Sequence, residues 1–298
     1  MIDGILNIYK EKGYTSHDVV AKLRGILKQK KIGHTGTLDP DAQGVLPVCL
    51  GKGTKLCDML TDRDKVYRAV LLLGQVTDTQ DTSGTVLRQS PVEVSEKEIR
   101  EAAESFLGAY SQVPPMYSAL KINGVKLCDL ARSGKTVERK PRAVTIYDLK
   151  IESVKLPRVT MTVSCSKGTY IRTLCQDIGE KLGCGGCMES LVRLKSGRFS
   201  LEESLTLSEV EELMAAGRIL DAVIPIDRIF EEYPALHVEK DFLRFLENGN
   251  PLESRMFKEK TAPPEMEQVR VYDESGIFWA VYGYKPEKRR FEPVKMFR

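Results

Sequence analysis

An aspartate in a segment rich in glycine and proline is the most conspicuous candidate for chemistry in this chain. Asp39 lies within residues 33–40, and the apolar run of residues 45–50 follows it. Pro40 restricts the backbone of the residue before it, which fixes the direction of the Asp39 carboxylate. A rigidly held carboxylate can act as a nucleophile or as a base. Asp-Pro next to glycine is equally typical of a simple turn, so the residues alone leave both interpretations open.

Regular elements on both sides are expected to position this segment. Residues 4–9 alternate like a short strand, and an amphipathic helix with Ser16 as its N-cap follows. Capping boxes at Ser95 with Glu98 and at Ser208 with Glu211 predict two further helices, the first reaching Leu107. Another helix is predicted before Gly183, and a short one over residues 54–60. Strands are predicted over residues 66–73, 144–156, 159–165, 268–272 and 277–284.

Composition limits the class of protein. The chain has 298 residues, 42% of them hydrophobic, enough for one large domain and a small one. No apolar run approaches the roughly 20 residues of a membrane helix, and the N-terminus lacks the apolar core of a signal peptide. The seven cysteines are odd in number and lie mostly in apolar runs, as expected for reduced thiols. We therefore expect a soluble, cytoplasmic protein.

Charge is distributed unevenly along the chain. Residues 1–201 contain 31 Lys and Arg against 22 Asp and Glu, residues 202–247 contain 4 against 12, and residues 248–298 contain 10 against 8. The basic surplus therefore accompanies the candidate site, which favours a polyanionic substrate. Scattered surface charge would give the same count, so this feature has little weight alone.

Two cysteines are spaced like metal ligands. Cys184 and Cys187 would need two more ligands for zinc, and His17, His34 and His237 do not lie in a recognisable partner motif. The pair follows a predicted helix end and does not open a helix after a strand, which argues against a thioredoxin-like redox role. We expect no metal site.

Five blocks in the first 200 residues resemble one enzyme family. The sequence GHTGTLDPDAQGVLPV at residues 33–48 resembles the signature of the TruB-type pseudouridine synthases, which isomerise uridine 55 in the TΨC loop of transfer RNA. The blocks KVYR (65–68), LGQVTDT (73–79), PMYSALK (115–121) and CSKGTYIR (165–172) agree with that family in the same order. Several ordered blocks make the resemblance specific.

The resemblance implies an α+β fold with two domains. The catalytic domain, residues 1–233, would have a central mixed, mainly antiparallel sheet, and residues 234–298 would form a small β-rich, PUA-like RNA-binding module. An insertion at about residues 115–142 corresponds to the family's thumb, which closes over the RNA loop. Residues 121–142 contain seven basic and two acidic side chains, which also fits a solvated surface hairpin. The C-terminal match is weak, and the basic tail is equally typical of a solubilising terminus.

The resemblance also implies roles for individual side chains. Asp39 would be the catalytic carboxylate and Tyr67 the aromatic on which the target uracil stacks, with a proton relay as a second role, while His34 inserts among the loop bases and Lys10 shapes the site. Arg172 lies in a predicted first helical turn, where the helix dipole disfavours a cation, which suggests a carboxylate partner. If that partner is Asp39, Arg172 would keep it ionised and directed. Further candidates for substrate or RNA contact are Leu191, Leu194, Lys121, Lys126 and Arg132. Core packing for Tyr67, Leu191 and Leu194, and exposed turns for Lys10 and His34, remain the structural alternatives.

Pseudouridine formation sets the chemical requirements. The N1–C1′ bond breaks and the base rejoins through C5 without redox change, so no cofactor is expected. Attack on C1′, addition at C6 and removal of a ribose proton all need a base or nucleophile, and the sequence does not choose among them. We predict a monomeric, stand-alone synthase acting on uridine 55 of transfer RNA. The alternatives are a guide-RNA-dependent subunit, a non-catalytic RNA-binding or tRNA chaperone protein, and a cysteine-dependent hydrolase, for which no cysteine lies in a nucleophile motif.

Overall fold

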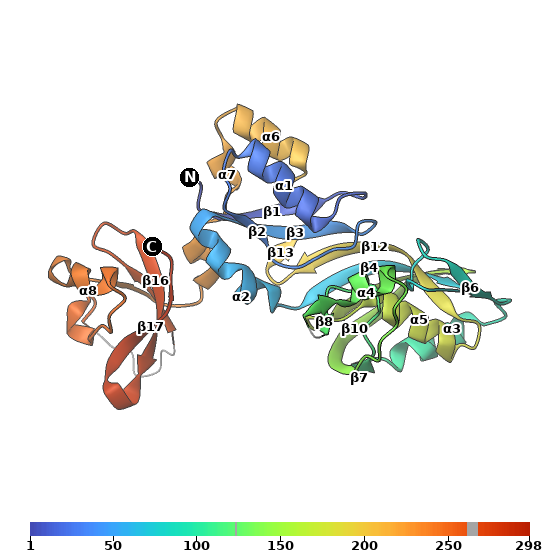
Figure 1. Cartoon of the computed structure of the whole chain (residues 1–298). Coiled ribbons are helices and arrows are strands. Elements are labelled where there is room, and N and C mark those ends of the chain that lie inside the picture. The colour runs from blue at the N-terminus through green and yellow to red at the C-terminus, as the bar shows by residue number, and fades with distance from the viewer. Residues whose placement is uncertain (123, 261–267) are drawn as a thin grey trace.

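A large mixed sheet forms the centre of the protein. The computed structural model describes residues 1–122, 124–260 and 268–298 (Figure 1). Within these residues nine strands form one sheet with the path β1-β3-β12-β4-β11-β10-β7, while β2 pairs with β3 and β13 with β12. Only β3 and β12 pair in parallel among its described strands, which confirms the predicted mixed, mainly antiparallel sheet. The strands are β1 (Gly4–Lys10), β2 (Ile32–His34), β3 (Gln43–Leu50), β4 (Lys65–Leu73), β7 (Gly108–Gln112), β10 (Arg142–Lys155), β11 (Arg158–Cys165), β12 (Gly186–Ser196) and β13 (Phe199–Ser200).

Helices cover the two ends of the sheet separately. Helices α1 (Ser16–Ile26), α6 (Leu207–Ala215) and α7 (Ile219–Ala222) pack on β1, β2 and β3 around a cluster that includes Leu23, Leu46 and Val210. Helices α3 (Glu96–Glu104) and α5 (Ile171–Lys181) pack at the other end, on β4, β10 and β11 (Figure 1). A 3-10 turn, η1 (Gly51–Leu56), and α2 (Cys57–Thr61) replace the single helix predicted over residues 54–60. No helix in the described ranges is long and apolar enough to cross a membrane.

Two predicted N-caps were wrong by one or two residues. Thr15, not Ser16, caps α1, because Thr15 and Asp18 form the reciprocal capping box. Thr206 with Glu209, not Ser208 with Glu211, caps α6, because the buried Leu207 already belongs to the helix. The capping box of Ser95 and Glu98 is confirmed, although α3 ends at Glu104 rather than near residue 107.

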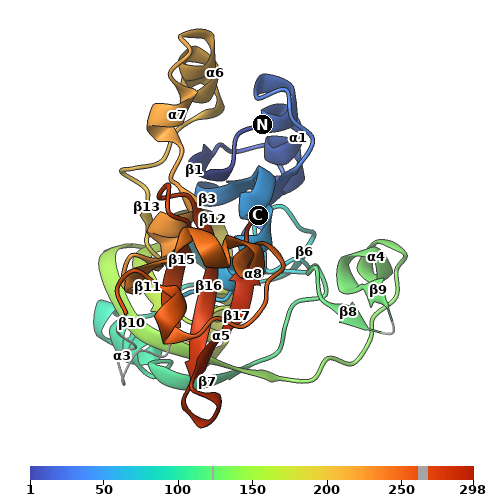
Figure 2. The ribbon, with the colours of Figure 1, turned by 90° about the vertical axis from the view of Figure 1, so that its left-hand side faces the viewer.

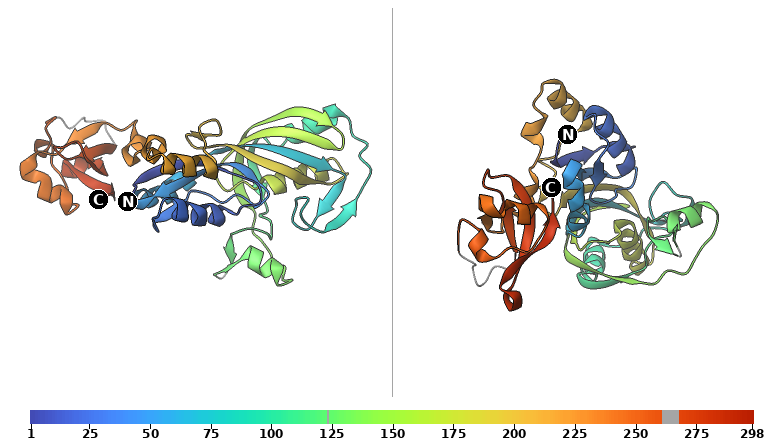
Figure 3. Two further views of the ribbon diagram at one scale, coloured as in Figure 1. Left: turned by 90° about the horizontal axis from the view of Figure 1, so that it is seen from above. Right: turned by 60° about the vertical axis from the view of Figure 1, so that its left-hand side comes forward.

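A small excursion leaves the sheet between two neighbouring strands. Gln112 at the end of β7 pairs with Arg142 at the start of β10, so residues 113–141 leave and re-enter the sheet at one point. They contain β8 (Lys121–Ile122), β9 (Val125–Lys126) and α4 (Leu127–Arg132). We call residues 113–141 the thumb. It stands off from the body in two different views (Figures 2 and 3).

The last part of the chain is a separate β domain. Its sheet has the order β14-β15-β16-β17, with β14 (Ala235–His237), β15 (Gln268–Tyr272), β16 (Phe278–Lys285) and β17 (Arg290–Met296). It packs against the N-terminal part of the chain, where Lys55 Nζ donates to the carbonyl of Met296 at 2.9 Å and the Tyr272 hydroxyl donates to Asp227 at 2.9 Å. The remaining elements are the β5 (Gln75–Thr77) and β6 (Val86–Gln89) hairpin, η2 (Ile226–Phe230), η3 (Lys240–Phe242), α8 (Leu243–Glu247), η4 (Ser254–Met256) and η5 (Pro286–Lys288).

Candidate active site

Four residues on four neighbouring strands form a row across the sheet. Lys10 on β1 lies opposite Gly44 on β3. Gly44 in turn lies opposite Arg193 on β12, and Arg193 lies opposite Tyr67 on β4. Directly opposed residues project to the same face, so the three side chains share one face. Gly44 has a φ of +104°, and a Cβ there would lie 2.3 Å from the Arg193 carbonyl oxygen. The row therefore requires glycine between Lys10 and Arg193.

The loop of residues 35–42 is held to this row on both sides of Asp39. The buried Lys10 ammonium donates to the carbonyls of Pro40 at 3.1 Å and Tyr14 at 2.5 Å. Arg193 Nη2 donates to the Gly36 carbonyl at 3.4 Å. The Leu38 amide donates to the buried Ser16 hydroxyl at 2.9 Å, which explains why Ser16 is not a cap. Backbone contacts at both ends thus fix the position of Asp39.

Arg172 makes a two-pronged contact with Asp39. Its Nε lies 3.0 Å from Asp39 Oδ2 and its Nη2 3.4 Å from Oδ1. The same guanidinium donates to the carbonyls of Thr79 at 3.0 Å and Tyr117 at 2.8 Å, and lies 3.6 Å from Asp81 Oδ2. The Arg172 side chain is 6% exposed and that of Asp39 is 40% exposed. A buried cation therefore orients a carboxylate that a substrate can reach.

The start of α5 places Arg172 without a side-chain cap. Tyr170 is the N-cap residue, and the amide of the buried Gln112 binds its backbone on both sides: Gln112 accepts from the Tyr170 N–H at 2.8 Å and donates to its carbonyl at 3.0 Å. Arg172 is the second helical residue, where the helix dipole opposes a cation. The Asp39 and Asp81 carboxylates offset that unfavourable placement.

The electrostatic environment perturbs the groups around Asp39. Burial raises the pKa of Asp39, Arg172 opposes that rise, and Asp81 adds to it. Burial lowers the pKa of Lys10 to about 8, against the opposing pull of Asp39. Burial also raises the pKa of Tyr67, which Arg193 counteracts. Perturbed groups that influence one another in this way are typical of functional sites.

His34 lies beside the same loop, at the end of β2. Its Nδ1 accepts the Gly36 N–H at 3.3 Å, so a neutral ring carries its proton on Nε2. Burial and the neighbouring His17, whose ring centroid is 5.8 Å away in an edge-on arrangement, lower the pKa of His34. His34 is therefore neutral at pH 7 and presents a flat ring next to the Asp39 loop.

The two candidate leucines have different surroundings. Leu191 is buried in the same cluster as Leu38 and Tyr67, so the structure brings it to the site. Leu194 lies in the bulge of β12 between Arg193 and Lys195, and its carbonyl accepts the Leu201 N–H at 2.9 Å. A wall formed by both leucines, as expected from the sequence, thus has structural support only for Leu191.

The candidate basic residues of the thumb are exposed. Lys121 and Lys126 are direct partners in the β8–β9 pair, and Arg132 on α4 lies 3.8 Å from Asp129. Like charges placed opposite each other destabilise a strand pair, so an anion between them would relieve the repulsion. The thumb connects to Asp39 through Tyr117, whose carbonyl binds Arg172.

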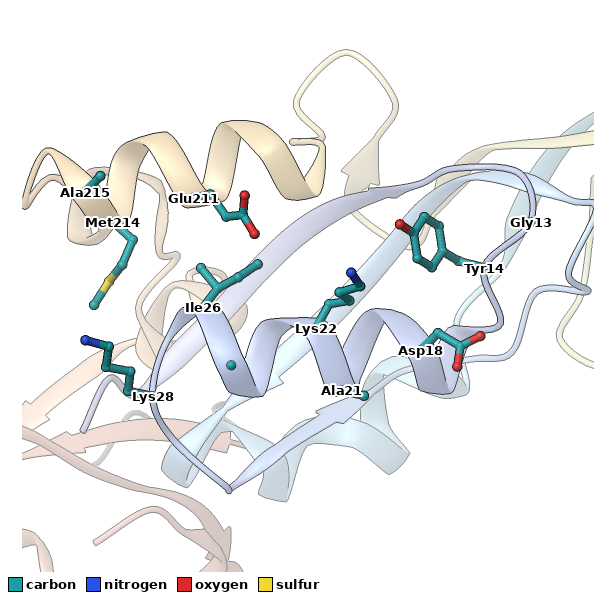
Figure 4. Close-up of a pocket in the computed structure, with 11 residues that line it drawn as sticks. Gly13, Tyr14, Asp18, Ala21, Lys22, Ile26, Lys28, Glu211, Met214 and Ala215 are labelled. Atoms are coloured by element: carbon teal, nitrogen blue, oxygen red, sulfur yellow. The ribbon is translucent and has the colours of Figure 1, made fainter.

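A surface groove between α1 and α6 does not include these residues. It has a volume of about 1050 Å³ and is lined by Gly13, Tyr14, Lys22, Lys28 and Glu211 among others (Figure 4). Its mixed charge and open shape contrast with the convergent contacts at Asp39. The convergent charged contacts therefore lie at the loop and not in this groove.

The environment of Cys187 favours the thiol form. Cys184 and Cys187 are both buried, and burial raises the pKa of Cys187 to about 11. Metals bind the thiolate, which this environment disfavours. Within the described parts of the chain no three His, Cys, Asp or Glu side chains gather as a metal site would require.

Comparison with known proteins decides the family. The model for the TruB family pseudouridylate synthase N-terminal domain matches residues 24–171, and that for the tRNA pseudouridylate synthase B C-terminal domain matches residues 172–231. The tRNA pseudouridine synthase B of Lachnoclostridium phytofermentans is 52% identical over 99% of this chain and 100% of the relative. That of Clostridium kluyveri is 45% identical with the same coverage. The chain belongs to the TruB family. The resemblance inferred from the sequence is thereby confirmed.

Solved structures show the same fold. The structure of a Cbf5-Nop10-Gar1 complex aligns with a TM-score of 0.73 and 26% identity, covering 99% of this chain and 85% of that chain. A structure of an H/ACA RNP bound to a substrate RNA containing 2′-deoxyuridine aligns with a TM-score of 0.72 and 24% identity, covering the same shares of both chains. The predicted α+β fold of the pseudouridine synthases is therefore confirmed.

Three residues of this TruB-family site were missed from the sequence. Asp81 follows the block at residues 73–79 by two positions, Gln112 lies at the base of the thumb, and Arg193 lies in the apolar stretch SLVRL. An arginine flanked by apolar residues in a strand could have signalled a buried cation. Nothing local could have shown that Asp81 reaches Arg172.

Proposed function

We propose that this protein isomerises uridine 55 in the TΨC loop of transfer RNA to pseudouridine, acting without a guide RNA. Membership of the TruB family and the names of relatives at 44–52% identity support this reaction. The observation that carries the proposal is the pair formed by Asp39 and Arg172, a reachable carboxylate held in two places by a buried guanidinium. Such a carboxylate is what attack on C1′, addition at C6 or ribose deprotonation requires.

The side chains around Asp39 take complementary roles in this proposal. Arg172 keeps Asp39 ionised and directed, and Lys10 holds the loop through Pro40. Tyr67 stacks on the flipped uracil and Leu191 forms an apolar wall beside it. His34, neutral and flat, occupies the space that the flipped base leaves.

The larger parts of the molecule divide the task. Residues 1–233 provide the chemistry, the thumb closes on the RNA loop through Lys121, Lys126 and Arg132, and residues 234–298 add an RNA-binding surface. We propose that the enzyme works as a cytoplasmic monomer and needs no metal ion for the reaction.

A guide-RNA-dependent mode is the second candidate, because the structural neighbours include H/ACA RNP complexes. Their identity to this chain is 24–26%, whereas curated relatives named tRNA pseudouridine synthase B are 44–52% identical. The stand-alone mode therefore has the stronger support.

The test is a reaction with purified components. The protein is incubated with an unmodified transfer RNA transcript in EDTA, without nucleotide or guide RNA, and pseudouridine is mapped along the RNA. We expect a single product at position 55. Modification that appears only after a guide RNA is added would establish the second candidate, and a product elsewhere in the transcript would refute the proposed target.

A further inference from the structure

A second buried arginine at the site is held without a carboxylate. Arg193 is 1% exposed, and its Nε donates to the Val45 carbonyl at 2.6 Å and its Nη2 to the Gly36 carbonyl at 3.4 Å. No ion pair joins it to a carboxylate of the described chain. A buried guanidinium without a counter-charge is costly to the fold. The placement of Arg193 at the site therefore points to a role other than stability.

The geometry directs this cation at Tyr67. Arg193 and Tyr67 are direct register partners on β12 and β4, so their side chains lie next to each other on the face that carries the site. Tyr67 is 8% exposed and belongs to the same buried cluster as Leu38 and Leu191. A guanidinium has only donors, so toward Arg193 the phenol oxygen can act only as an acceptor. That constraint turns the hydroxyl proton of Tyr67 away from Arg193.

The same guanidinium also touches the loop that carries Asp39. It donates a hydrogen bond to the carbonyl of Gly36, which lies two residues after His34 and three before Asp39 in the chain. A Cβ at Gly36, whose φ is +147°, would lie 3.7 Å from Arg193 Nη1. Its bond to Val45 continues the contact into β3. One side chain thus spans the distance between Tyr67 and the catalytic loop.

We propose that Arg193 is a positioning residue that fixes the Tyr67 ring relative to the Asp39 loop. This inference rests on the proposed function, in which the target uracil stacks on Tyr67 within reach of Asp39. The planar fork of arginine can contact the phenol and two carbonyls at once, whereas a lysine ammonium has one nitrogen for all three. The opposing influence of Arg193 on the raised pKa of Tyr67 agrees with close contact between the two groups.

A double-mutant cycle on Arg193 and Tyr67 tests the proposal. Pseudouridine formation is measured for Arg193→Lys, Tyr67→Phe and the double variant, with Arg158→Lys as the matched control. Arg158 lies on β11, the neighbour of β4 on the side away from β12. Its Nη2 forms an exposed ion pair with Glu189 Oε1 at 2.8 Å. We expect Arg193→Lys to lower kcat about tenfold or more with little change in KM, and Arg158→Lys to change neither. In the Tyr67→Phe background, Arg193→Lys should cost much less than it does alone.

A spectroscopic measurement provides a readout that a purely structural role would not change. The 11 tyrosines are replaced by 3-fluorotyrosine, and the ¹⁹F signal of residue 67 is assigned by its disappearance in Tyr67→Phe. Arg193→Lys should shift this signal, because the cation next to the phenol is less well placed. Arg158→Lys should leave the signal unchanged.

Three results would overturn the proposal: additive effects in the cycle, a residue-67 signal that Arg193→Lys does not move, or failure of both Arg193→Lys and Arg193→Gln to fold. The last would make Arg193 a purely structural residue. Absence of pseudouridine with the unaltered protein would instead refute the proposed function, and the ¹⁹F signal would still test the contact between Arg193 and Tyr67.

Discussion

At the scale of single residues, three buried or nearly buried cations converge on one loop. Lys10 and Arg193 hold carbonyls on the two sides of Asp39, and Arg172 holds its carboxylate. Burying three cations is unfavourable unless each finds acceptors, and here each of the three finds at least one acceptor in the loop. The carboxylate is therefore in position before the substrate arrives, which is what electrostatic preorganisation requires.

Asp81, the second carboxylate that lies next to Arg172, should influence the lowest pH at which the enzyme is active. Because the charge of Asp81 raises the pKa of Asp39, Asp81→Asn should lower it, and Asp39 would remain ionised to lower pH. We expect the acid limb of the kcat profile to move to lower pH, and kcat itself to fall because Arg172 loses a partner. Asp221→Asn, which removes an exposed carboxylate on α7, is the control and should leave the profile unchanged. An acid limb that stays in place or moves to higher pH would contradict this assignment.

At the scale of elements, the parallel pairing of β3 with β12 assembles the site. It places Gly44 against Arg193 and so joins the half of the sheet that carries Lys10 to the half that carries Tyr67. The alternation of a strand predicts which face a residue occupies but not which distant strand lies beside it. Local sequence therefore predicted the β4 strand, and the family resemblance singled out Asp39 and Arg172, whereas neither indicated the row through Arg193 or the reach of Asp81.

Gly44 is the position where this junction is least tolerant of change. In Gly44→Ala, the Cβ would collide with the Arg193 backbone and the backbone would be strained at a φ of +104°. We expect the free energy of unfolding to drop by about 1–3 kcal/mol or more, measured by denaturant titration. Gly25→Ala is the contrasting control: it lies in α1 with open space around it, and helix propensity favours alanine by up to about 1 kcal/mol. Equal stability of Gly44→Ala and the unaltered protein would show that the junction is not close-packed.

The thumb is expected to contribute affinity through charge. Lys121→Gln with Lys126→Gln should weaken binding of transfer RNA and reduce the slope of log affinity against log salt by about 0.7–0.9 for each phosphate that the protein no longer neutralises. Lys97→Gln with Lys150→Gln removes the same charge from α3 and β10 and should have little effect. If both pairs change the slope equally, the thumb lysines act only through the net charge of the protein.

At the scale of the whole molecule, the two domains share one hydrophobic cluster. Ile5 and Phe230 of the N-terminal part pack with Val281 and Phe297 of the C-terminal domain. The family resemblance implied a boundary between residues 233 and 234, but the sequence gave no sign of this contact, because the contributing residues are separated by up to 292 positions in the chain. The C-terminal domain is thus packed onto the sheet and not merely tethered to it.

Unfolding should therefore be cooperative across both domains. Trp279, the single tryptophan, lies in β16 and reports on the C-terminal domain, while circular dichroism reports on the whole chain. We expect the two unfolding transitions to coincide. Phe230→Ala should lower the free energy of unfolding measured by both signals by about 3–5 kcal/mol, because it leaves a cavity in the shared cluster. A fluorescence transition that separates from the dichroism transition in the unaltered protein would show that the domains unfold independently.

Asp39→Asn tests the proposed chemistry most directly. Asparagine keeps the size of the side chain and its place before Pro40 but removes the charge and the nucleophile. The variant should fold and bind transfer RNA with about the affinity of the unaltered protein, while single-turnover formation of pseudouridine falls below detection. Pseudouridine formed by Asp39→Asn at close to the normal rate would contradict both the assignment of the site and the chemistry built on it.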